Sequence, residues 1–157
     1  MKRIVTLLLG VMVMLVACGA NQGTPEPPKI HYSEDVCSDC GMIINDARFA
    51  GAYAVEKEPG RFESYIFDDV GDMLAHMQKN QTLKAVEWWV HDFNSEAWIA
   101  AKTASYVVSD QIKSPMNHGI AAFAQQADAD AFAAQYGVKP LDWDKLRIEE
   151  AMAEHGH

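Results

Sequence analysis

The chain reads Ala50-Gly51-Ala52-Tyr53-Ala54-Val55 and then, after Lys57-Glu58-Pro59-Gly60, Arg61-Phe62-Glu63-Ser64-Tyr65-Ile66-Phe67. Aromatic and β-branched residues favour strands, because their side chains pack well on a pleated surface. A Pro-Gly pair between two such runs is typical of a tight turn. The two runs are therefore predicted to form a β-hairpin.

A helix is predicted directly after this hairpin. Asp68 or Asp69 can cap its N terminus, since an aspartate accepts hydrogen bonds from the free N–H groups of the first turn. Asn80 ends the pattern, and His76 falls on the face expected to meet water. Residues 86–93 then alternate in polarity and predict a strand with two different faces. The apolar positions at helical spacing, expected in the core, are Val70, Met73, Leu74 and Met77.

The second half of the chain repeats this order of elements less clearly. Its predicted elements are strands over 105–109 and 119–123 and helices over 128–136 and about 144–154. Two strand–strand–helix units in tandem predict an α+β fold of two small ββα(β) subdomains. The expected boundaries are about residues 30–93 and 94–157.

Charge and hydropathy each exclude one class of protein. The 157 residues carry a formal net charge of −9. Residues 1–17 contribute Lys2 and Arg3 but no acid, so their removal would leave 11 basic and 22 acidic residues, a net charge of −11. Nucleic acid binding requires basic surface, which so acidic a chain lacks. No stretch after Cys18 has the length and apolar character of a membrane span, which excludes a polytopic membrane protein.

The first 17 residues are predicted to be a secretory signal. A basic head precedes an apolar run over residues 4–16, and the run ends in Leu15-Val16-Ala17-Cys18. This ending resembles the lipobox of bacterial lipoproteins, in which the cysteine thiol is acylated and becomes the new N terminus. The alternative is a transmembrane anchor, but the run falls short of the ~20 residues needed to span a bilayer.

Residues 18–29 are predicted to form a lipidated flexible tether. Pro25, Pro27 and Pro28 favour extended backbone, and no residue there could build a core. The globular part is therefore expected outside the cytoplasm, held near a membrane on its periplasmic side. Gly19 rather than aspartate after the cysteine favours the outer membrane in a Gram-negative cell.

The remaining two cysteines form a Cys37-Ser38-Asp39-Cys40-Gly41-Met42 motif. One alternative is a disulfide or redox dithiol, because thiols outside the cytoplasm usually oxidise. A thioredoxin-type site would follow a strand, and only the tether precedes this pair. A four-thiolate zinc site would need two more cysteines. The fourth alternative is Cu(I), which prefers thiolate and thioether ligands, and Met42 supplies a thioether next to Cys40.

A second candidate segment is Ser114-Pro115-Met116-Asn117-His118-Gly119. It is a polar turn, where burial of a methionine in the core is not expected from the sequence pattern alone. Met116 could therefore be either a core residue or a thioether ligand. His118 could be a solvated loop histidine, or it could complete a metal site.

These motifs together resemble the NosL family of copper-binding bacterial lipoproteins, accessory proteins of nitrous-oxide reductase. The resemblance covers nearly the whole chain after the signal, and one departure is Asn117, where the family has glycine. The matching elements, in order, are the lipobox Cys18, Cys37-Ser38-Asp39-Cys40-Gly41-Met42, Phe67-Asp68-Asp69-Val70-Gly71-Asp72-Met73-Leu74, Val90-His91-Asp92-Phe93, Trp98, Tyr106-Val107-Val108, Pro115-Met116 and Gly119-Ile120-Ala121-Ala122-Phe123.

The resemblance implies a fold similar to part of organomercurial lyase and a role as a Cu(I) metallochaperone rather than an enzyme. The implied partners are immature nitrous-oxide reductase and the ABC-type transporter complex NosDFY. The implied metal ligands are Cys40, Met42 and Met116, with Cys37 and His118 as further candidates.

Two alternatives to the metallochaperone remain. An extracytoplasmic dithiol–disulfide oxidoreductase would need Cys37 and Cys40 equally and neither methionine. A structural lipoprotein would use a Cys37–Cys40 link only to hold the N-terminal segment.

Overall fold

The structure is a computed structural model that describes residues 23–154, and its mixture of helices and antiparallel sheets confirms the α+β class. The predicted signal and Cys18 lie outside the described residues. The elements in chain order are the 3-10 helix η1 (Ala47–Phe49), β1 (Gly51–Glu58), β2 (Arg61–Phe67), α1 (Val70–Lys79), β3 (Ala85–His91), β4 (Trp98–Ala100), the 3-10 helix η2 (Ala101–Thr103), β5 (Ser105–Val108), β6 (Ile120–Phe123), α2 (Gln126–Ala133) and α3 (Trp143–Glu154).

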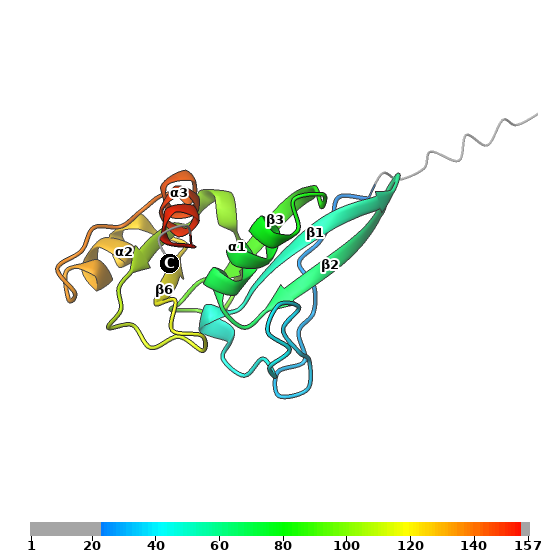
Figure 1. Ribbon diagram of the computed structural model, residues 1–157. Helices are drawn as coiled ribbons and strands as arrows, with labels where there is room; N and C mark the ends of the chain where they lie inside the picture. The colour runs from blue at the N-terminus through cyan, green and yellow to red at the C-terminus, as the bar shows by residue number, and fades with distance from the viewer. Residues whose placement is uncertain (1–22, 155–157) are drawn as a thin grey trace, which may run out of the picture.

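The predicted hairpin is confirmed as β1 and β2, which form the long antiparallel ribbon in Figure 1. Gly60 closes its turn with φ +73°, a backbone conformation that glycine adopts without steric cost. The sheet order is β2-β1-β3-β4, so β1 is a central strand. Tyr53 of β1 faces the core under α1, while Ala52 faces a smaller cluster around Trp89. Both sheet faces are therefore covered at β1.

Helix α1 begins and ends where the sequence predicts. Asp69 is its N-cap and accepts a hydrogen bond from the N–H of Gly71 at 3.0 Å, and Asn80 is its C-cap. Met73 is fully buried against the sheet. This contact between helix and sheet fixes the position of the first residues of α1.

The prediction that His76 faces water is wrong. Its ring lies among Tyr53, Tyr65 and Phe67, and Nδ1 is 2.6 Å from the Tyr53 hydroxyl. Helical periodicity identifies only the centre of the buried stripe, whereas the aromatic rings of the hairpin reach the flank of the helix. Burial lowers the pKa of His76 because it disfavours the imidazolium form.

The second half forms a two-stranded sheet, β5 with β6, covered by α2. Strand β4 was not expected, and although it lies beyond residue 94 it pairs with β3 of the first sheet. Trp143 at the start of α3 packs its ring 5.4 Å from that of Trp88 and 5.8 Å from that of Tyr106. The two halves are thus joined through β4 and Trp143, and α3 packs beside α1.

The described chain begins at the turn of the hairpin. Residues 23–25 lie beside Gly60, Phe62 and Val86. From there the chain runs back along the sheet to the loop below β2, drawn in blue and cyan in Figure 1. Within residues 23–154, none of the helices combines the length and the apolar character that crossing a bilayer requires.

Candidate metal centre

The segment that carries both described cysteines is a tight loop, residues 36–43, here called the thiol loop. The N–H of Cys37 donates to the carbonyl of Met42 at 2.8 Å, and the N–H of Gly41 donates to the carbonyl of Cys37 at 3.0 Å. Gly41 has φ +72°, so the glycine before Met42 supplies the left-handed turn. The N–H of Ser38 donates to the carbonyl of Ile66 at 2.8 Å, which attaches the loop to the edge of β2.

This attachment places both thiols against the N-terminal end of α1. The Cys37 thiol donates to Asp72 Oδ2 at 3.6 Å, and the Cys40 thiol donates to Asp68 Oδ1 at 3.5 Å. One ligand atom from each of these four residues lies within 4.8 Å of all the others. We call Cys37, Cys40, Asp68 and Asp72 the sulfur–carboxylate cluster.

Three of the four residues of the cluster are buried. Cys37, Asp68 and Asp72 are nearly inaccessible, whereas Cys40 is partly exposed. Both cysteines are free thiols in the structure. The Oδ2 atom of Asp68 is buried and has no hydrogen-bond partner among the described residues. An unpartnered buried carboxylate oxygen is costly, and a bound cation would satisfy it.

The electrostatics of the cluster favour neutral thiols until a cation arrives. Burial raises the pKa of both Cys37 and Cys40, and the neighbouring carboxylates add to the rise. Burial also opposes a charge on Asp72, but hydrogen bonds from His118 and the two thiols outweigh it, so the pKa of Asp72 is lowered. A cysteine binds a metal as the thiolate, so metal binding would release protons from Cys37 and Cys40.

The second candidate segment, residues 114–119, reaches the same end of α1, and we call it the Pro-Met turn. The Ser114 hydroxyl donates to Asp69 Oδ2 at 2.5 Å, and the N–H of Met116 donates to the same oxygen at 3.1 Å. Asn117 has φ +61°. This left-handed conformation suits asparagine, which tolerates it better than most residues other than glycine.

His118 connects the Pro-Met turn to the cluster. Its Nε2 lies 3.1 Å from Asp72 Oδ1, and its Nδ1 lies 3.8 Å from a carboxylate oxygen of Glu150. The hydrogen bond to Asp72 raises the pKa of His118 in spite of burial. The ring rests on Gly71, where an added Cβ would lie 2.0 Å from His118 Cγ. Glycine at this position therefore permits the close contact.

The structure thus brings four of the five candidate ligands to one end of α1. Cys37 and Cys40 meet in the cluster, and His118 contacts Asp72 of the cluster. The backbone N–H of Met116 donates to Asp69, the residue that follows Asp68 of the cluster. Met42 projects from the thiol loop with half of its surface exposed. Their coordination of a metal stays a prediction.

Asp68 and Asp72 are members of the cluster that the sequence did not identify. The sequence pattern offers Asp68 only as a candidate helix cap, yet the cap is Asp69. Helical spacing could not have identified the pair, because Asp68 precedes the N-cap Asp69 and so lies outside α1. Two cysteines are too few for a four-thiolate zinc site, but aspartate oxygens are zinc ligands as well. The cluster offers sulfur to a soft ion and oxygen to a harder one.

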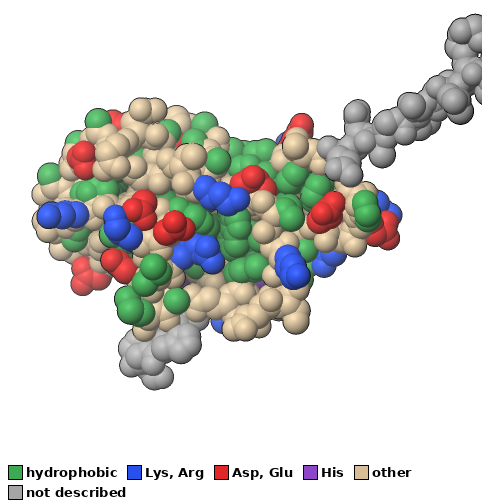
Figure 2. Space-filling view, turned by 90° about the horizontal axis from the view of Figure 1, so that it is seen from above, with side chains coloured by type: hydrophobic (Ala, Val, Ile, Leu, Met, Phe, Trp, Pro, Cys, Tyr) green, Lys and Arg blue, Asp and Glu red, His purple; other side chains and the backbone are tan. Residues whose placement is uncertain are grey.

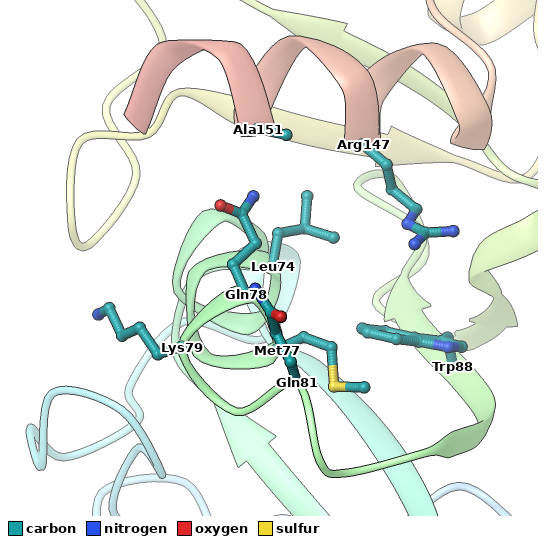
Figure 3. A pocket seen from close by; sticks show the side chains of 8 residues that line it. All are labelled: Leu74, Met77, Gln78, Lys79, Gln81, Trp88, Arg147 and Ala151. Carbon is teal, nitrogen blue, oxygen red and sulfur yellow. The ribbon is translucent and has the colours of Figure 1, made fainter. Parts of the chain in front are cut away.

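A separate groove of about 580 Å³ lies between α1 and α3 (Figure 3). Leu74, Met77 and Trp88 form its floor, and Arg147 extends from α3 toward Trp88. Figure 2 shows hydrophobic side chains in this hollow with charged groups around it. The groove contains no cysteine and no candidate ligand, so it is distinct from the cluster.

Comparison with known proteins decides the family. The NosL family model matches residues 28–151. The chain belongs to the NosL family. It is 32% identical over 167 residues to the copper-binding lipoprotein NosL of Stutzerimonas stutzeri, an alignment that covers 95% of this chain and 85% of that protein.

A solved NosL structure confirms the fold. The crystal structure of the copper chaperone NosL from Shewanella denitrificans superposes with a TM-score of 0.62 and 25% identity, covering 77% of this chain and 96% of that one. The predicted membership of the NosL family is therefore confirmed. The likeness to organomercurial lyase stays a prediction.

Proposed function

We propose that this NosL-family protein is a lipid-anchored, periplasmic Cu(I) metallochaperone and not an enzyme. Two relatives are named as copper-binding or as a copper chaperone. The observation that carries the proposal is the junction of the thiol loop and the Pro-Met turn beside the buried, unpartnered oxygen of Asp68.

Cu(I) would be bound chiefly by the thiolate of Cys40 and the thioethers of Met42 and Met116. Soft sulfur donors suit a monovalent soft ion in a two- or three-coordinate arrangement. Cys37 and His118 are the further candidates, and Asp68 and Asp72 would balance the positive charge. Cys40 is partly exposed and Met42 half exposed, so an ion bound by them would be open to an incoming donor.

Delivery would proceed by ligand exchange from that open side. An incoming donor would bond to Cu(I) as Cys40 or Met42 leaves, and the buried members would keep the pocket shaped. The proposed recipient is immature nitrous-oxide reductase, with NosDFY as the associated complex. Acylation at Cys18 would restrict the search to the membrane surface and raise the effective concentration of partners.

The dithiol–disulfide oxidoreductase is the second candidate, and the thiol chemistry disfavours it. A redox-active cysteine needs a lowered pKa to form the attacking thiolate. Here burial and nearby carboxylates raise the pKa of both thiols.

An anaerobic Cu(I) titration against a competing chelator tests the proposal. We expect the affinity to fall about 100-fold in Cys40→Ser and about 10-fold in Met42→Ala and Met116→Ala. Met152→Ala is the matched control, because Met152 is an exposed methionine on α3. Unchanged affinity in all three site variants would refute the site. Loss of dithiol–disulfide exchange activity in both Cys37→Ser and Cys40→Ser, with no loss in Met42→Ala or Met116→Ala, would favour the oxidoreductase.

A further inference from the structure

The thiol loop, which carries two members of the metal centre, exposes large apolar side chains. Val36, Met42 and Ile43 each expose half or more of their surface, which distinguishes them from the buried hydrophobic residues of the core. Exposing apolar side chains to water is unfavourable, and exposed apolar residues that cluster mark interaction sites.

Val36 and Ile43 form one continuous apolar spot. They are partners in an antiparallel bridge. The N–H of Cys37 donates to the carbonyl of Met42, and the N–H of Ile44 donates to the carbonyl of Asp35, on either side of the bridge. Val36 and Ile43 are therefore a non-hydrogen-bonded pair, the kind in which facing side chains approach most closely.

This spot borders the open side of the cluster. Cys37, Asp68 and Asp72 are buried and Cys40 is partly exposed, so a donor atom from another molecule would reach the cluster at Cys40. Any molecule that does so must come against the thiol loop, whose two ends are joined by the Val36–Ile43 bridge.

The charge around the spot indicates what kind of surface it fits. Glu34 and Asp35 precede Val36, and Asp39 follows Cys37. Lys79 pairs with Asp39, and His31 lies 3.3 Å from Asp35. Acidic groups therefore outnumber basic ones at the rim, and an apolar face bordered by Lys or Arg is complementary to it.

We infer that Val36 and Ile43 form the docking surface for the copper recipient, a protein that presents an apolar patch with a basic rim next to its own metal ligands. This inference rests on the proposed function and extends it. Docking on these residues would place the recipient's donor atom at Cys40 and Met42 while leaving the ligands themselves unchanged.

Two measurements separate docking from metal binding. The full chain is loaded with Cu(I), mixed anaerobically with metal-free nitrous-oxide reductase, and the copper in the reductase is followed over time after the proteins are separated. Cu(I) affinity is measured in parallel by chelator competition. The test variant is Val36→Glu/Ile43→Glu, and the matched control is Ile148→Glu/Met152→Glu, which adds the same charge at exposed apolar residues of α3.

We expect Val36→Glu/Ile43→Glu to slow transfer at least tenfold with a Cu(I) affinity within twofold of the wild type, while the control transfers normally. Val36→Thr/Ile43→Thr keeps the β-branched shape of the bridge, and we expect it to slow transfer severalfold without loss of fold.

Transfer at the wild-type rate in the glutamate and threonine variants would overturn the inference, as would equal slowing in the control. It would also be overturned if sedimentation showed a wild-type dimer that the glutamate variant dissociates, because the surface would then join two copies of this chain. Failure of the wild type to bind Cu(I) would instead refute the proposed function.

Discussion

The thiol loop and the Pro-Met turn both reach the N-terminal end of α1, but they meet it with different groups. The thiol loop contributes the side chains of Cys37 and Cys40 to the sulfur–carboxylate cluster. The Pro-Met turn is fastened by the Ser114 hydroxyl and the Met116 N–H, both bound to Asp69. The first region supplies reactive atoms, while the second is held by hydrogen bonds that leave the Met116 thioether uncommitted.

At the N terminus of α1, the residues that contact the thiols differ from the residue that holds the Pro-Met turn in place. Asp68 and Asp72 face the thiols, whereas Asp69 between them holds the turn. Three carboxylates are tolerated here partly because the free N–H groups and the dipole of α1 favour negative charge at its N terminus. Removing the positioning contacts should therefore separate the two regions without touching a sulfur atom.

Asp69→Ala is expected to have the largest effect. It removes the helix cap and leaves the Ser114 hydroxyl and the Met116 N–H without their buried acceptor. We expect the free energy of unfolding in urea to fall by about 3 kcal/mol. Asp110→Ala is the control, because Asp110 is exposed in a loop, and it should change stability by less than about 0.5 kcal/mol. Equal effects of the two variants would show that Asp69 does not fasten the turn.

Gly71→Ala is expected to rank second, because it forces His118 away from α1. The added Cβ would lie 2.0 Å from His118 Cγ. Overpacking of this kind should cost about 2 kcal/mol, although alanine is the better helix former. In a His118→Gly background the same substitution should cost little, because the Cβ of His118 is removed together with the obstructing ring. Urea unfolding of the four proteins gives the coupling energy, and purely additive effects would contradict the proposed contact.

His118→Gln is expected to have the smallest effect and to depend on pH. The hydrogen bond to Asp72 raises the pKa of His118 above its usual 6.5. The stability that this pair contributes is therefore fully present below pH 6.5 and is lost as the pH rises through the raised pKa.

For the metal-free protein we expect His118→Gln to lower the free energy of unfolding by roughly 0.5 to 1 kcal/mol at pH 6 and by less at pH 8.5. Urea unfolding at the two pH values measures this difference. A difference that does not change with pH would mean that His118 only fills space at this position.

Local sequence patterns predicted the elements that depend on local interactions. The hairpin, the Asp69 cap and Asn80 at the end of α1 follow from turn chemistry, capping and periodicity. Strand β4 has only three residues, so it is too short to show alternation, and its pairing with β3 is set by tertiary structure. The flank position of His76 likewise depends on rings brought in by the hairpin.

In the candidate site, too, local motifs were predictable from the sequence and contacts between distant residues were not. The Cys-x-x-Cys-Gly-Met and Pro-Met motifs identify two sulfur-bearing segments. Asp68 and Asp72 become part of the cluster only because Ser38 pairs with Ile66 and brings residues 37–40 against α1. Such contacts between distant residues leave no spacing in the sequence that could be read.

The described chain starts beside the turn of the hairpin, whereas the cluster lies at the other end of β2, directly after Phe67. Seven residues of strand at about 3.3 Å each place roughly 20 Å between these two points. A molecule anchored through Cys18, as proposed, would thus carry its other two cysteines on the side turned away from the attachment, and the hairpin would act as a spacer between anchor and cluster.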